Sequence, residues 1–330
     1  MSKKFQVVGI GNAIVDVLSL ADDSFLDLMG IEKGIMQLVE RERAELLYSA
    51  MENRKQAAGG SVANTLAGIG NLGLKTGFVG RVRDDALGRF YAETMEMDGT
   101  RFLNPPVPGA DLPTSRSMIF VSPDGERSMN TYLGISAELG PEDVDEAIAA
   151  QAEIVFLEGY LFDKDKGKAA FERMARACRA AGGKAGIAIS DPFCVERHRD
   201  DFRRLIEGEL DYVIGNEKEI EALWPGSDWR EALARTGEIC PLVVCTRSGD
   251  GVSILSGGEQ VDVPVESIVP VDATGAGDGF AAGFLYGLAT GADLRRAGEM
   301  GCAVALEVIR HVGPRADTDL RALFQARGFI

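Results

Sequence analysis

The stretch Val-Pro-Val-Asp-Ala-Thr-Gly-Ala-Gly-Asp-Gly-Phe-Ala-Ala-Gly-Phe-Leu, residues 269–285, joins a turn to the start of a predicted helix. Gly275, Ala276 and Gly277 have little or no side chain, so a ligand can approach their backbone N–H groups closely. The residues that follow, to Leu288, lack proline and can continue as a helix whose positive dipole end faces the same place. Such a place stabilises an anion, and a phosphoryl group in transfer is a common occupant.

Asp278 lies at the mouth of this predicted anion site, where a carboxylate costs electrostatic energy. One interpretation is a helix cap, since aspartate is a preferred N-cap residue. The other is a catalytic base that accepts a proton from an attacking hydroxyl while the amides hold the phosphoryl oxygens. From these residues alone the cap is the commoner arrangement.

The seven residues Asp272 to Asp278, Asp-Ala-Thr-Gly-Ala-Gly-Asp, resemble the C-terminal signature of the ribokinase-like (PfkB-type) carbohydrate and nucleoside kinases. The resemblance implies that Asp278 is the catalytic base. It also implies that the amides of Gly275, Ala276 and Gly277 form the anion hole. An unbroken match over seven positions is far more specific than an isolated Gly-x-Gly.

A second segment, Ala58 to Leu74, resembles the N-terminal signature of the same family. The resemblance implies that Gly59 and Gly60 let the backbone approach a sugar. Asn64, one turn into the following helix, is then expected to reach the same ligand. The alternative is a tightly packed helix with small residues at its contacts, and both interpretations can hold together.

The first predicted strand, Phe5–Ile10, leads into a glycine-containing turn that partly matches a dinucleotide fingerprint. The match fails because Ile14 occupies the third glycine position and Asp16 comes far earlier than the acidic residue ~20 positions on that binds ribose. A nicotinamide dehydrogenase is therefore disfavoured. Asn12 and Asp16 instead resemble the Asn-x-x-x-Asp with which adenosine kinases hold ribose, and a solvated loop aspartate is the alternative.

Two short predicted strands, Ser115–Ser122 and Arg127–Leu133, flank Pro-Asp-Gly-Glu, a hairpin signal. The resemblance implies a small β-sheet lid over the sugar, formed by about 13–45 and 100–135. Arg127 resembles a lid arginine that adenosine kinases carry near the phosphates. A surface arginine is the alternative.

From Pro141 onward strands and helices alternate, which predicts an α/β fold with a doubly wound, mainly parallel sheet. With the resemblance, this implies one ribokinase-like kinase domain over residues 1–330. Such sheets bind ligands at the carboxyl ends of their strands. Asn216 and Glu219 follow the predicted strand Tyr212–Gly215 and resemble the family's Asn-x-x-Glu motif for Mg²⁺. The resemblance implies that these residues contact the ion largely through water molecules. An N-capped helix start is the alternative.

Two further sets of residues take their roles from the resemblance alone. The nucleotide loop after the next strand implies ATP contacts at Thr246, Arg247, Gly249 and Gly251, with Asn216. The monovalent cation site implies K⁺ at Asp272, Thr274, Val308, His311 and Gly313.

Composition limits the partners. The chain of 330 residues has a formal net charge of −16, which argues against nucleic acid and anionic membranes. Five cysteines without C-x-x-C spacing suggest neither a disulfide framework nor a zinc site. We expect a cytoplasmic protein, a monomer or homodimer, without a membrane span or signal peptide.

The sequence thus predicts an ATP-dependent phosphotransferase that uses Mg²⁺ and phosphorylates the primary hydroxymethyl of a nucleoside or sugar. The segments Gly-Asn-Ala-Ile-Val-Asp, 29–40, 159–162 and 190–193 resemble adenosine kinases most, which favours adenosine to AMP. A sugar kinase of ribokinase or fructokinase type stays open. A non-catalytic ligand-binding relative is the alternative from another class.

Overall fold

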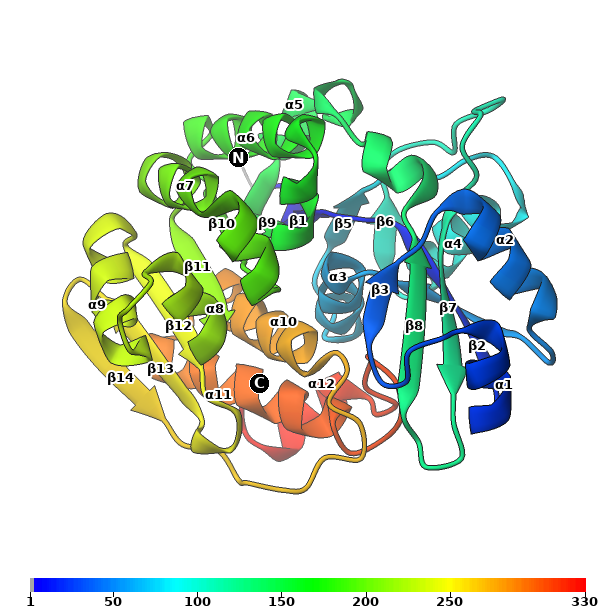
Figure 1. Cartoon of the computed structure of the whole chain (residues 1–330). Coiled ribbons are helices and arrows are strands. Elements are labelled where there is room, and N and C mark those ends of the chain that lie inside the picture. The colour runs from blue at the N-terminus through cyan, green and yellow to red at the C-terminus, as the bar shows by residue number, and fades with distance from the viewer. Residues whose placement is uncertain (1–2) are drawn as a thin grey trace.

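The computed structural model describes residues 3–330 and contains two β-sheets (Figure 1). The larger sheet has nine strands in the order β14-β13-β12-β11-β10-β9-β1-β5-β6, and the seven strands from β12 to β6 are all parallel to one another. Only β13 and β14 are added antiparallel. The strands are β1 (Phe5–Ile10), β5 (Thr76–Val79), β6 (Thr100–Phe102), β9 (Ala152–Glu158), β10 (Lys184–Ala188), β11 (Tyr212–Asn216), β12 (Leu242–Thr246), β13 (Val252–Ser256) and β14 (Glu259–Val263).

Helices cover both faces of this sheet, because its central strands are apolar on both sides. In β9, Ile154 and Phe156 belong to one buried cluster and Val155 and Leu157 to the other. The first face is covered by α3 (Ser61–Asn71), α10 (Ala276–Ala289), α11 (Leu294–Val308) and α12 (Leu320–Ala326). The second is covered by α5 (Glu146–Ala149), α6 (Asp165–Ala180), α7 (Pro192–Glu209), α8 (Glu217–Leu223) and α9 (Trp229–Ile239). The predicted doubly wound α/β fold is confirmed.

The second sheet has five strands in the order β3-β8-β7-β2-β4 and stands at one side of the large sheet (Figure 1). Its strands are β2 (Ile14–Leu20), β3 (Met36–Leu38), β4 (Lys55–Gly59), β7 (Ser115–Val121) and β8 (Arg127–Tyr132). The helices α1 (Asp23–Met29), α2 (Arg41–Ala50) and α4 (Ala86–Met97) contribute to the same buried cluster as this small sheet. That cluster also contains residues of the large sheet.

The small sheet differs from the predicted lid ranges of 13–45 and 100–135 in two places. Strand β4 lies outside both ranges and pairs with β2, placing Ala57 opposite Asp16. Its sequence, Lys-Gln-Ala-Ala-Gly, has no β-branched or aromatic residue, so no strand pattern marks it. Strand β6 lies inside the second range but pairs with β5 of the large sheet.

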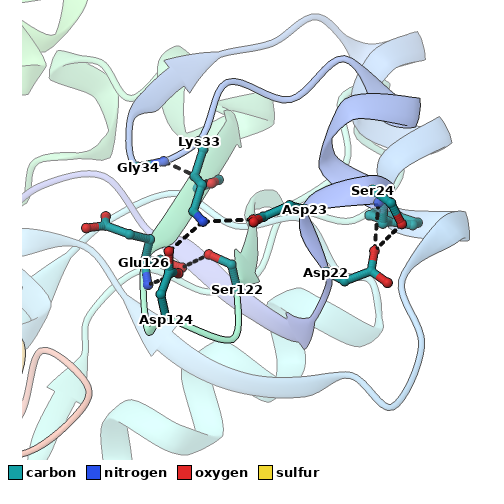
Figure 2. Close-up of polar contacts among 10 residues, drawn as sticks. Asp22, Asp23, Ser24, Lys33, Gly34, Ser122, Asp124 and Glu126 are labelled. Atoms are coloured by element: carbon teal, nitrogen blue, oxygen red, sulfur yellow. Dashed lines mark hydrogen bonds and ion pairs between the residues drawn. The ribbon is translucent and has the colours of Figure 1, made fainter.

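Ion pairs of Lys33 with Asp23 and Asp124 connect segments at the end of the small sheet where β7 turns into β8 (Figure 2). The ammonium of Lys33 lies 2.7 Å from a carboxylate oxygen of Asp23 and 2.6 Å from one of Asp124. These hydrogen bonds raise the pKa of Lys33 to about 12, and the bond from Lys33 lowers that of Asp124 to about 2. The turn between β7 and β8 is thereby joined to the segment that leads into β3.

Within residues 3–330, none of the helices is both long and apolar enough to cross a bilayer.

Candidate active site

A cavity of about 700 Å³ lies where the carboxyl ends of β9 to β12 meet the small sheet and the start of α10. This is the edge at which doubly wound sheets bind ligands. The predicted site residues in its wall are Asn12, Asp16, Gly60, Asn216, Glu219, Thr246, Thr274, Gly275, Ala276, Gly277 and Asp278. Residues far apart in the sequence are thus brought to one place.

Asp278 is a cavity residue rather than the cap of its helix. The N-cap of α10 is Gly275, and it has a left-handed backbone with φ of 77°. The carboxylate of Asp278 accepts hydrogen bonds from Ser61 Oγ at 2.6 Å and from Asn64 Nδ2 at 2.9 Å, both on α3. Burial raises the pKa of Asp278 to about 6, against these bonds and the charge of Arg315. The capping interpretation is wrong for this residue.

Three backbone amides at the start of α10, those of Gly275, Gly277 and Asp278, have no acceptor within the described chain. The first N–H groups of a helix lack intrahelical partners, and the amides of Gly277 and Asp278 find none in the preceding turn. The amide of Ala276 is different, because it donates to Ala273 O at 3.2 Å. Gly275 is required by packing, since a Cβ there would lie 2.3 Å from the carbonyl oxygen of Pro314.

Asp16 projects from β2 into the cavity, and its carboxylate has no hydrogen-bond partner among residues 3–330. Gly59 lies against it, because a Cβ at Gly59 would come within 2.5 Å of that carboxyl group. Burial raises the pKa of Asp16 to about 6, while the charges of Arg127 and Arg315 oppose the rise. A partly buried carboxylate without partners is suited to accept hydrogen bonds from a ligand.

Asn12 is held by protein groups on both sides of its amide. Its Nδ2 donates to Glu158 at 2.9 Å, and its Oδ1 accepts from Ser136 Oγ at 3.1 Å. Glu158, at the end of β9, also accepts from the backbone amides of Asn12 and Val62. Burial raises the pKa of Glu158 to about 7. Glu158 is a site residue that no predicted motif contains, although an acidic residue at the end of a buried strand is a usable signal.

Asn64 and Arg127 lie behind the cavity wall. Asn64 contacts Asp278 through its amide nitrogen. Arg127, on β8, donates to Asp272 at 2.9 Å, and both side chains are nearly buried. In this structure Asn64 and Arg127 contact the carboxylates of Asp278 and Asp272, and their direct contacts with a ligand stay predictions.

Asn216 and Glu219 form a capping box at the start of α8 and also face the cavity. Asn216 Oδ1 accepts from the amide of Glu219 at 3.0 Å, and Glu219 accepts from Asn216 Nδ2 at 2.7 Å. Burial raises the pKa of Glu219 to about 7. No group of three or more His, Cys, Asp or Glu within the described residues could hold a metal ion by itself.

Of the predicted nucleotide loop, only Thr246 lies in the cavity wall. Arg247 stacks over the ring of Trp229 at 5.2 Å. Gly251 has φ of 88°, and a Cβ there would lie 2.1 Å from the carbonyl oxygen of Val263. A Cβ at Gly249 would lie 2.7 Å from Ser267 Oγ. Gly251 therefore has a packing reason for its small size, whereas a Cβ at Gly249 would meet only a serine side chain that can move.

Among the residues expected to bind K⁺, Thr274 and Gly313 contact Asp272. Its Oδ1 accepts from the Thr274 amide and its Oδ2 from the Gly313 amide, both at 2.9 Å. Burial opposes ionisation of Asp272, but these bonds and the charge of Arg127 keep its pKa below the usual value. Within residues 3–330, no group donates to the carbonyl oxygens of Val308, His311 and Gly313.

Two hydrogen bonds of the site join residues that are far apart in the sequence, so no local pattern predicts them. Ser61 belongs to the Gly-Gly-Ser segment of the N-terminal signature, but its bond to Asp278 spans 217 positions. Arg315 bonds to Asn64 across 251 positions and lies in no motif that we identified.

The sequence and fold of this chain resemble those of known proteins. A family model described as pfkB family carbohydrate kinase matches residues 30–321. The solved structure of a probable sugar kinase protein from Rhizobium etli CFN 42 is 42% identical, with a TM-score of 0.91 over 99% of this chain and 100% of that one. Adenosine kinase from Sinorhizobium meliloti is also 42% identical, with a TM-score of 0.89 and the same coverage. An uncharacterized sugar kinase of Archaeoglobus fulgidus is 29% identical over 75% of this chain and 96% of its own.

Proposed function

This chain belongs to the pfkB family of carbohydrate kinases and is therefore a sugar or nucleoside kinase, and we propose that it transfers the γ-phosphoryl group of ATP to the primary hydroxymethyl of a nucleoside, preferentially adenosine. One observation carries this proposal: the carboxylate of Asp278 and the free amides of Gly277 and Asp278 share one cavity. A base for the hydroxyl and donors for the phosphoryl oxygens thus lie together.

The proposed reaction requires Asp278 to be well positioned more than it requires a strong base. Asp278 accepts the proton of the attacking hydroxyl, and the transfer usually has a loose transition state in which that proton leaves late. Position then matters more than basicity, and two hydrogen bonds from α3 hold the carboxylate in place. The intact carboxylate and amides disfavour the non-catalytic alternative.

The walls near Asp16 favour a nucleoside over a sugar. Five apolar side chains of or next to the small sheet line the same cavity: Ile14, Met36, Leu38, Met129 and Leu133. A free sugar presents hydroxyls on most sides and leaves such a wall without polar partners, whereas a nucleobase has flat faces that pack on apolar groups. Asp16 is then the acceptor for ribose hydroxyls.

ATP and Mg²⁺ are assigned to the opposite part of the cavity. Thr246, Asn216 and Glu219 lie there, with hard oxygen and amide groups that suit Mg²⁺ bound largely through water and phosphate. When bound, Mg²⁺ would neutralise part of the negative charge of the phosphates. We also propose K⁺ at the carbonyl oxygens of Val308, His311 and Gly313 beside Asp272.

The test is ADP release by the purified protein with Mg-ATP and a panel of nucleosides and sugars. Adenosine is expected to have the highest kcat/KM, and Asp278→Asn serves as the inactive control. A higher kcat/KM with ribose or fructose than with adenosine would indicate a sugar kinase. No turnover of any acceptor would favour the non-catalytic relative.

A further inference from the structure

Arg315 lies in the loop between α11 and α12 and joins three other segments of the chain. Its Nε donates to Asn64 Oδ1 at 2.9 Å, and its Nη2 donates to Ala58 O at 2.6 Å. Its Nη1 donates to a carboxylate oxygen of Asp98, at the end of α4. The guanidinium is thus bonded to α3, to β4 of the small sheet and to α4.

Asn64 stands between Arg315 and Asp278, and this determines how its amide must point. A guanidinium only donates and a carboxylate only accepts hydrogen bonds. Asn64 therefore satisfies both neighbours in one orientation, with Oδ1 toward Arg315 and Nδ2 toward Asp278. A flipped amide would place its oxygen against the carboxylate of Asp278, which favours the protonated acid and removes the base.

The geometry points to Arg315 as a positioning residue for the phosphoryl transfer: it locks the Asn64 amide so that Nδ2 holds Asp278 as an oriented carboxylate. This inference rests on the proposed function, because it assigns the base of that reaction. Arg315 does not line the 700 Å³ cavity, so its action on the reaction goes through Asn64 and through its charge.

The charge acts in the same direction as the hydrogen bonds. The guanidinium of Arg315 opposes the rise in pKa that burial imposes on Asp278. Asp16, Glu158 and Tyr160 each interact with the charge of Asp278, while α3 offers only neutral donors. Arg197, Asp191 and Glu219 line the same cavity. Removal of Arg315 takes away a positive charge that lowers the pKa of Asp278, so this pKa rises.

The experiment compares Arg315→Met with the wild type and with Arg176→Met, a control at an exposed arginine of α6 that pairs with Glu209. We expect Arg315→Met to lower kcat about 10-fold or more, with KM for both substrates changed less than about threefold. The acid limb of the kcat profile should move to higher pH. Arg176→Met should match the wild type.

Two further variants separate orientation from charge and from folding. Arg315→Lys keeps the charge but not the fork of donors, so the acid limb should stay in place while kcat falls. In an Asn64→Leu background, Arg315→Lys should add little to the loss, because lysine keeps the charge and the link through Asn64 is already broken. An equal loss in both backgrounds would overturn the proposal, as would wild-type kcat and pH dependence in Arg315→Met.

A measurement without turnover keeps this inference separate from the proposed function. The pKa of Asp278 can be followed by NMR of carboxyl-labelled aspartate, with Asp278→Asn assigning the signal. The pKa of Asp278 should be higher in Arg315→Met than in the wild type, even if no acceptor is phosphorylated. An unchanged pKa in a folded Arg315→Met would contradict the electrostatic part, and together with unchanged kcat it would refute the assignment.

Discussion

Four acidic side chains in one cavity have raised pKa values, and they differ in their hydrogen-bond partners. Asp278 is held by Ser61 and Asn64, and Glu158 by Asn12 and Val62. Glu219 is part of a capping box, whereas Asp16 has no partner in the described chain. Strongly perturbed carboxyl groups gather at functional sites. Asp278 and Asp16 are therefore the positions to change.

Asp278→Asn should lower kcat roughly 100-fold or more, because the amide keeps the shape of the carboxylate but cannot accept the proton. The affinity for ATP and acceptor should change little. Single-turnover rates and binding titrations check both, with the melting temperature as a control for folding. Wild-type turnover in a folded mutant would remove Asp278 from the chemistry.

Asp16→Ala should weaken binding of the acceptor and leave ATP binding nearly intact. Loss of a charged hydrogen-bond acceptor costs about 1.5–3 kcal/mol, which is a tenfold or larger change in affinity. Isothermal titration with the preferred nucleoside measures it. The assignment fails if mutant and wild type bind that nucleoside equally well.

At the element scale, the site depends on how α10 and its preceding loop are anchored. Gly283 of α10 lies so close to α11 that a Cβ would come within 2.3 Å of the carbonyl oxygen of Met300. This contact fixes the helix start that carries the free amides. Asp272 joins the same loop to Gly313 and, through Arg127, to the small sheet.

Potassium should raise kcat several-fold over a bulky organic cation at matched ionic strength. The reason is that a cation at the carbonyl oxygens of Val308, His311 and Gly313 would hold the loop from Asp272 to Gly277 in place. Steady-state rates across a potassium titration test this, with Asp272→Asn expected to abolish the response. Identical rates in both salts would count against a monovalent cation site.

At the scale of the whole molecule, the acidic cavity makes stability depend on pH. Burial raises the folded pKa values of Asp16 and Asp278 to about 6 and those of Glu158 and Glu219 to about 7, all above the ordinary values of these groups. Between about pH 4 and pH 7 the folded state therefore binds more protons than the unfolded chain. The free energy of unfolding must then fall as pH rises through this range.

The melting temperature of the ligand-free protein should accordingly be higher at pH 5.5 than at pH 7.5. Each such group contributes at most about 1.4 kcal/mol per pH unit. Glu158→Gln is the control, because glutamine does not titrate and the slope should become shallower. A melting temperature that rises from pH 5.5 to 7.5 would contradict the prediction.

The alternating pattern of strands and helices was enough to predict the doubly wound sheet, because side-chain periodicity is a local property of the chain. The same holds for the anion-hole segment, in which Gly275, Gly277 and Asp278 are neighbours in sequence as in space. The small sheet was predicted less completely. Strand β4 carries no local signal and exists because β2 offers it an edge to pair with.

The partners of the site carboxylates were decided by the tertiary structure alone. Ser61 meets Asp278 across 217 positions, Arg127 meets Asp272 across 145, and Arg315 meets Asn64 across 251. A hydrogen bond depends on which donors the packed elements bring within about 3 Å of an acceptor, and no local pattern encodes that distance. Sequence therefore determined which residues could do the chemistry, and the packing of α3, α10 and the C-terminal loop decided which residues hold them in position.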